Sequence, residues 1–217
     1  MFRLLSIMIE CFSSIIFVIP AVLIWQYKIA RQKNFYKLLM LLVFVFYMIA
    51  VFSVTGIPTV TELNTIDFSF NFIPLISIMN DSVEYIKNSM LNIILFMPLG
   101  FLLPIIWKEY HSYKKTVMTG LILSIIIEIL QIFTFRLTDI DDLITNTLGA
   151  ILGYSIAKII LVRVSYKISK ISNDNTVKNE AVIILILAFL ISFLLKPLVS
   201  NLLWEILLES PLWEQIK

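Results

Sequence analysis

The chain has 217 residues, of which 59% are hydrophobic and only 15% are charged. A soluble globular domain carries about 25% charged residues, so the composition argues against a soluble fold and for a chain embedded in a bilayer. One cysteine and one histidine leave almost no ligands for Cys/His metal chemistry and exclude a disulfide within the chain. The net charge of +2, without a dense basic block, gives no indication of nucleic-acid binding.

Six segments are long and apolar enough to span a membrane, which takes about 20 residues of helix. The first contains Arg3, Glu10 and Pro20, so five spans remain an alternative to six. It is too long and too polar inside for a cleaved signal peptide. The expected fold class is therefore all-α, a polytopic integral membrane helical bundle. The predicted spans are 4–25, 36–57, 89–107, 117–135, 142–162 and 180–200.

Basic residues are concentrated in alternate connections between these spans. They are Lys28, Arg31, Lys33 and Lys37; Lys108, Lys114 and Lys115; and Arg163, Lys167, Lys170 and Lys178. The other two connections contain only Lys87 and Arg136. The positive-inside rule therefore predicts that both termini and the Thr59–Lys87 connection face outward.

The chain divides into four parts. Residues 1–35 form an N-terminal transmembrane helix, and residues 36–162 form the core. A polar cytoplasmic linker over 163–179 leads to a C-terminal transmembrane helix and tail over 180–217. Apolar and acidic residues alternate in the tail, a pattern typical of an amphipathic helix at the membrane interface.

Amide and carboxyl side chains recur near the outer ends of the three central spans. Such groups are costly within a bilayer and suggest a functional site. Glu128 and Gln131 are three residues apart and hence on one helix face. The predicted topology puts the whole set at one depth, so we expect one site. The candidate site residues are Asn92, Glu128, Gln131, Arg136, Asp139, Asp141, Asp142 and Asn146.

A structural interpretation of the same residues stays open. Glu128 could pair with Arg136, either Asp141 or Asp142 could cap the following helix, and the amides could join helices through hydrogen bonds. Two further features concern packing. Gly149 and Gly153 have the spacing that permits close helix approach, and Pro98 and Pro104 predict a kink.

The order and spacing of these residues resemble the VanZ-like family of bacterial membrane proteins over about residues 36 to 162. The residues that carry the resemblance are Asn71–Leu75, Asn92–Pro104, Ser124, Glu128, Gln131, Arg136–Leu143, Asn146–Gly149 and Gly153. Leu75 departs from the Phe usual in the family. The resemblance implies a multi-pass protein of the bacterial cytoplasmic membrane. The family is named for a member that contributes to resistance to teicoplanin, a glycopeptide that attacks lipid-linked cell-wall precursor.

Three functions follow as hypotheses. The first is a non-enzymatic envelope factor that binds a lipid-linked cell-wall precursor, a glycopeptide or another partner at the outer face of the bilayer. The second is a membrane-embedded enzyme acting on an envelope lipid or peptide, because carboxylates in unequal environments can divide acid and base roles. The third, a transporter, is less favoured because the polar groups lie off the midplane and no repeat is visible. No catalytic residue, cofactor, metal or nucleic-acid partner is assigned.

Overall fold

The computed structural model describes residues 2–63, 70–71, 82–134, 138–163 and 177–210. Among these residues six helices are long and apolar enough to cross a membrane, which confirms the predicted all-α, six-span fold class. The long helices are α1 (Phe2–Lys28), α2 (Phe35–Thr55), α4 (Ser82–Ile106), α5 (Tyr113–Gln131), α6 (Ile140–Arg163) and α8 (Glu180–Glu209). The shorter elements are the 3₁₀ turns η1 (Lys108–His111) and η2 (Ile132–Thr134) and the strands β1 (Phe70–Asn71) and β2 (Thr138–Asp139).

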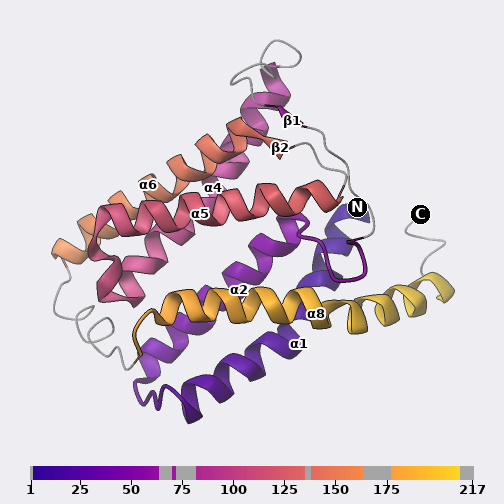
Figure 1. The fold of residues 1–217 in the computed structure, drawn as a ribbon, viewed down its shortest axis with the longest axis horizontal. Helices are drawn as coiled ribbons and strands as arrows, with labels where there is room; N and C mark the ends of the chain where they lie inside the picture. Colours follow the sequence, from indigo (N-terminus) through magenta and orange to yellow (C-terminus); the bar gives the residue numbers. More distant parts are fainter. Residues whose placement is uncertain (1, 64–69, 72–81, 135–137, 164–176, 211–217) are drawn as a thin grey trace.

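The helices form two neighbouring groups. In Figure 1, α4, α5 and α6 lie together above α1, α2 and α8. The most extensive contacts are between α4 and α6 in the first group and between α1 and α8 in the second. Helix α2 contacts α4 as well as α8, so it joins the groups.

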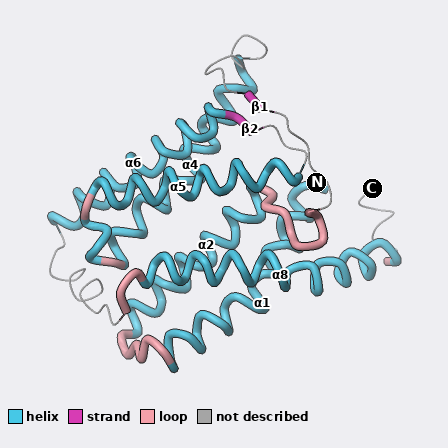
Figure 2. Tube along the Cα trace, viewed as in Figure 1, coloured by secondary structure: helices cyan, strands magenta, loops and turns pink. Residues whose placement is uncertain are grey.

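Successive connections alternate between the two ends of the bundle (Figure 2). Residues 29–34, 107–112 and 177–179 lie at one end, which we call the basic end. Residues 56–63 and the β1–β2 pair lie at the other, which we call the loop end. The alternation explains why bases in every second connection are brought together in space.

Helices α4 and α8 extend furthest beyond their predicted limits. Helix α4 begins at Ser82 and runs through Pro98 and Pro104 without a break. Helix α8 continues past residue 200 to Glu209. Its Pro197 lacks the N–H that would bond the Phe193 carbonyl four residues earlier. That carbonyl instead accepts a hydrogen bond from the Val60 amide at 3.1 Å.

The extension of α8 bears on the predicted tail. Residues 201–209 are helical and continue α8, and their many leucines favour helix formation. The ring of Trp204 lies 5.4 Å from that of Phe2 at the start of α1. The remaining tail residues, 211–217, lie outside the described part of the chain.

Glycines allow the backbones of α4 and α6 to pack closely together. A Cβ atom added at Gly153 would overlap the Met97 carbonyl oxygen of α4, and one added at Gly149 would overlap that of Ile93. From the other side, a Cβ at Gly100 would overlap the Ala150 carbonyl oxygen. The predicted packing role of Gly149 and Gly153 therefore has a direct physical basis, since only glycine leaves room for these backbone contacts.

Candidate functional site

Glu128 holds the connection between α5 and α6 against α5. Its side chain is buried, with 3% of the residue exposed, and its Oε2 accepts a hydrogen bond of 3.1 Å from the Asp139 backbone N–H. Asp139 lies in β2, which pairs with β1 in a parallel register of Phe70 with Thr138 and Asn71 with Asp139. This contact fixes where the chain enters α6.

Asp139 is the residue that caps α6. Its Oδ1 accepts a hydrogen bond of 3.0 Å from the Asp141 N–H, which is one of the donors that a helix start leaves without a partner. The prediction that Asp141 or Asp142 is the cap is therefore wrong. Both lie within the first turn, where their negative charge is favourable near the helix N-terminus.

Asn92 joins α4 to the start of α6. Its Nδ2 donates to Asp142 Oδ1 at 2.7 Å, and the Thr145 hydroxyl lies within 3.5 Å of the same nitrogen. A hydrogen bond to a carboxylate is shorter and stronger than one between neutral groups. Asp142 is thereby positioned by a neighbouring helix as well as by its own.

Asn146 lies one turn further into the bundle, where its Nδ2 donates to the Ser124 hydroxyl of α5 at 2.9 Å. The residue is only 4% exposed, and its Oδ1 finds no donor among the described residues. Buried polar atoms nearly always have a hydrogen-bond partner. Asn146 Oδ1 is therefore a buried acceptor whose hydrogen-bonding capacity is unused among the described residues.

The side chain of Gln131 bonds to the end of α2. Its Nε2 donates at 3.0 Å to the carbonyl oxygen of Thr55, the last residue of α2. Carbonyls in the last turn of a helix have no partner within that helix. The chain then turns at Gly56, whose φ of 66° is a conformation that glycine adopts readily. Gln131 thus ties α5 to α2.

The structure joins five of the eight predicted site residues in two short hydrogen-bonded units. One unit contains Glu128, Asp139 and Asp141, and another contains Asn92 and Asp142. Arg136 lies outside the described residues, so its pairing with Glu128 stays a prediction. Within the described part of the chain, no three His, Cys, Asp or Glu residues are placed to share a metal ion.

A second polar cluster, absent from the sequence prediction, is buried at the basic end. Glu180 at the start of α8 pairs with Lys37 of α2 at 2.7 Å, and both side chains are fully buried. The two oxygens of Glu180 also accept hydrogen bonds from Gln26 Nε2 at 3.0 Å and from Trp107 Nε1 at 2.8 Å. Four helix termini therefore meet at one carboxylate.

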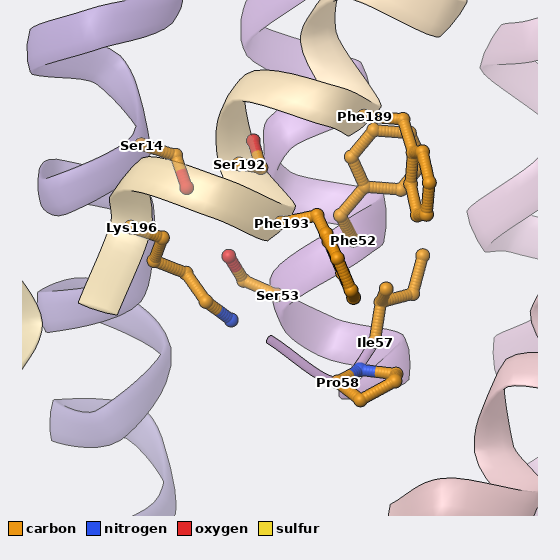
Figure 3. Close-up of a pocket in the computed structure, with 9 residues that line it drawn as sticks. All are labelled: Ser14, Phe52, Ser53, Ile57, Pro58, Phe189, Ser192, Phe193 and Lys196. Atoms are coloured by element: carbon orange, nitrogen blue, oxygen red, sulfur yellow. The ribbon is translucent and has the colours of Figure 1, made fainter. Parts of the chain in front are cut away.

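A third polar cluster lies between α1, α2 and α8 (Figure 3). Lys196 of α8 pairs with Glu10 of α1 at 2.9 Å, and their side chains are 10% and 23% exposed. Lys196 and three serines line a cavity of about 10 Å³, close to the size that holds one water molecule. The serines are Ser14, Ser53 and Ser192.

The sequence contained a signal for both additional clusters. Glu10 and Lys196 are charged residues within apolar spans, where an unpaired charge is costly. Lys37 was assigned to a connection, although it lies in α2 and is fully buried. Pairing an acid in one span with a base in another would have required knowing which helices are neighbours.

The fold and its buried polar groups define a multi-pass α-helical membrane protein with a hydrogen-bonded site at one end of a three-helix unit. A family model described as VanZ/LLP1 matches residues 38–163, and the chain belongs to this family. Protein VanZ of Enterococcus faecium is 46% identical over 63 residues, which are 29% of this chain and 38% of that protein. No solved structure matches the chain. Helices α1 and α8 lie outside the family match.

Proposed function

We propose that this protein acts at the outer face of the bacterial cytoplasmic membrane and raises tolerance to a teicoplanin-type glycopeptide. It does so by altering the interaction between the antibiotic and the lipid-linked cell-wall precursor. The similarity to Protein VanZ supports this class of function. The concentration of Lys and Arg at the basic end supports an outward loop end.

The observation that carries the proposal is the gathering of buried and half-buried polar side chains from α4, α5 and α6 at the loop end. Asn92 and Asp142 face each other there, and Asn146 offers an acceptor oxygen that has no donor among the described residues. A ligand with hydroxyl or ammonium groups supplies such donors. Arg136, next to this site in sequence, offers a planar fork suited to phosphate or carboxylate.

An enzyme acting on an envelope lipid or peptide is the second candidate. It is favoured by the unequal surroundings of the carboxylates, because Glu128 is buried while Asp139 and Asp142 are partly exposed. Such a difference separates acid from base roles. A mixture of purified protein and lipid-linked precursor distinguishes the two: an enzyme converts the precursor, whereas a binding factor leaves it unchanged.

The test is glycopeptide tolerance of cells that express the protein. Asp142→Ala and Arg136→Ala should each abolish the added tolerance while the amount of membrane protein stays normal. Glu205→Ala is the matched control, since it also removes one charged side chain, from the exposed surface of α8 outside the family match. If the Asp142 and Arg136 variants are folded and fully protective, the polar cluster serves only to hold the helices together.

A further inference from the structure

An open groove at the basic end lies between the start of α5 and the last turns of α6. Its volume is about 540 Å³. The rings of Tyr113 and Tyr154 meet edge to face with centroids 5.5 Å apart, and both line the groove. The Tyr154 hydroxyl donates to the His111 carbonyl oxygen at 2.6 Å. This aromatic side of the groove is therefore held in place by the turn before α5.

The other side of the groove combines positive charge with an apolar strip. Lys158 and Arg163 are exposed and neither forms a salt bridge within the described part of the chain. Ile159 and Val162, which are 55% and 76% exposed, lie between them in sequence on the same helix. Among the described residues, no carboxylate lines the groove. Its chemistry matches an amphiphile with an anionic head and a hydrocarbon chain.

The groove is preformed because α6 is anchored on its opposite face. Ala157 of α6 is fully buried against Ile105 of α4, and Phe101, Ile160 and Leu161 pack around this pair. A site that needs no rearrangement loses less free energy on binding. The segment that follows, 164–176, contains Lys167 and Lys170 against the single acid Asp174, so its charge does not complement the groove.

We propose that this groove binds an anionic phospholipid, whose phosphate pairs with Lys158 and Arg163 and whose apolar part contacts the exposed side chains of Ile159 and Val162. Basic pockets between transmembrane helices recognise lipid head groups by this combination of charge and apolar surface. The groove is at the end of the bundle opposite the polar site of Asn92, Asp142 and Asn146, so it is independent of the function proposed above.

The test compares lipids bound to the purified protein by native mass spectrometry, with phosphatidylglycerol and phosphatidylcholine supplied in equal amounts. The wild-type protein should retain phosphatidylglycerol preferentially. In the double variant Lys158→Gln/Arg163→Gln this preference should fall by about 30-fold, given the typical contribution of each base near anionic lipid. Lys158→Arg/Arg163→Lys should keep the preference because it keeps both charges.

The matched control is Lys28→Gln/Lys33→Gln, which removes two exposed bases from the same end but outside the groove. It should leave the preference unchanged. An equal loss in this control would show attraction by overall charge and would overturn the proposal. Equal retention of the two lipids by the wild type would overturn it too. Filling the groove with Ser155→Trp should reduce retention of phosphatidylglycerol while every charge remains, and full retention would contradict the assigned position.

Discussion

The two helix groups are held together by different chemistry. In the α4–α6 pair, glycines bring one backbone against another, and carbonyl oxygens of α4 occupy the space that side chains would fill. In the α1–α2–α8 group, ion pairs connect helices, and the pair of Lys37 with Glu180 is fully buried whereas that of Glu10 with Lys196 is partly exposed. Apolar surface alone does not select helix partners in lipid, so close packing and interhelical polar contacts must do so.

The difference follows the limits of the family match. The glycine-packed helices lie within residues 38–163, whereas α1 and α8 lie outside. Glu180 of α8 nevertheless bonds Trp107 of α4, and its ion-pair partner Lys37 lies just before the matched segment. Glu180 thus links the additional helices to the family core at the basic end, while the Val60–Phe193 hydrogen bond and the ring contact of Phe52 with Phe189 link α8 to it elsewhere.

Replacing Gly153 by leucine should have the largest effect, because the new side chain must displace the α4 backbone at Met97. We expect a loss of about 5 kcal/mol or more, at the extreme of single substitutions. The folded, monodisperse fraction in mild detergent measures it. Ser155→Leu, an exposed position half a turn away, is the control and should remain folded. A well-folded Gly153→Leu protein would show that the interface is not close-packed.

Glu180→Ala tests the charge-linked group. It leaves Lys37 buried without its partner, and such changes cost about 3–5 kcal/mol. The double variant Lys37→Met/Glu180→Leu should regain most of this stability, because both charges are removed together. The stabilities of the wild type, Lys37→Met, Glu180→Leu and the double variant, measured by melting in one detergent, give the coupling energy. Additive losses, with no recovery in the double variant, would mean that the ion pair does not link α2 to α8.

Asp139→Ala removes the cap of α6 and should cost about 1 kcal/mol. Asp139→Asn keeps an acceptor at the same position and should lose less. Asp141→Asn is the control that removes a negative charge from the same turn and keeps the capping hydrogen bond, because Asp141 donates to Asp139 through its backbone N–H. A larger loss in Asp141→Asn than in Asp139→Ala would move the capping role away from Asp139.

Asn146→Ala should have the smallest effect on stability, about 0.6 kcal/mol for one interhelical hydrogen bond. It removes the bond to Ser124 together with the unpartnered oxygen. If that oxygen meets a ligand, glycopeptide tolerance should fall although the melting temperature hardly changes. Ser124→Ala removes the same bond and keeps the oxygen, so it should retain tolerance. Equal loss of tolerance in both variants would assign the effect to the bond between helices.

The sequence by itself determined the six spans, because each is a long apolar run, and it determined which connections share an end, because their bases alternate. It also identified Asn92, Glu128, Asp142 and Asn146 as unusual, since polar groups in such runs are costly. Only the tertiary structure decided their partners. Glu128 bonds a backbone N–H, Gln131 reaches the end of α2, and Lys37 meets Glu180 143 positions later in the chain, at 2.7 Å. A long apolar run identifies a span from the residues of that segment alone. A hydrogen bond depends on which atoms of a distant segment lie within about 3 Å, and only the tertiary structure brings those atoms together.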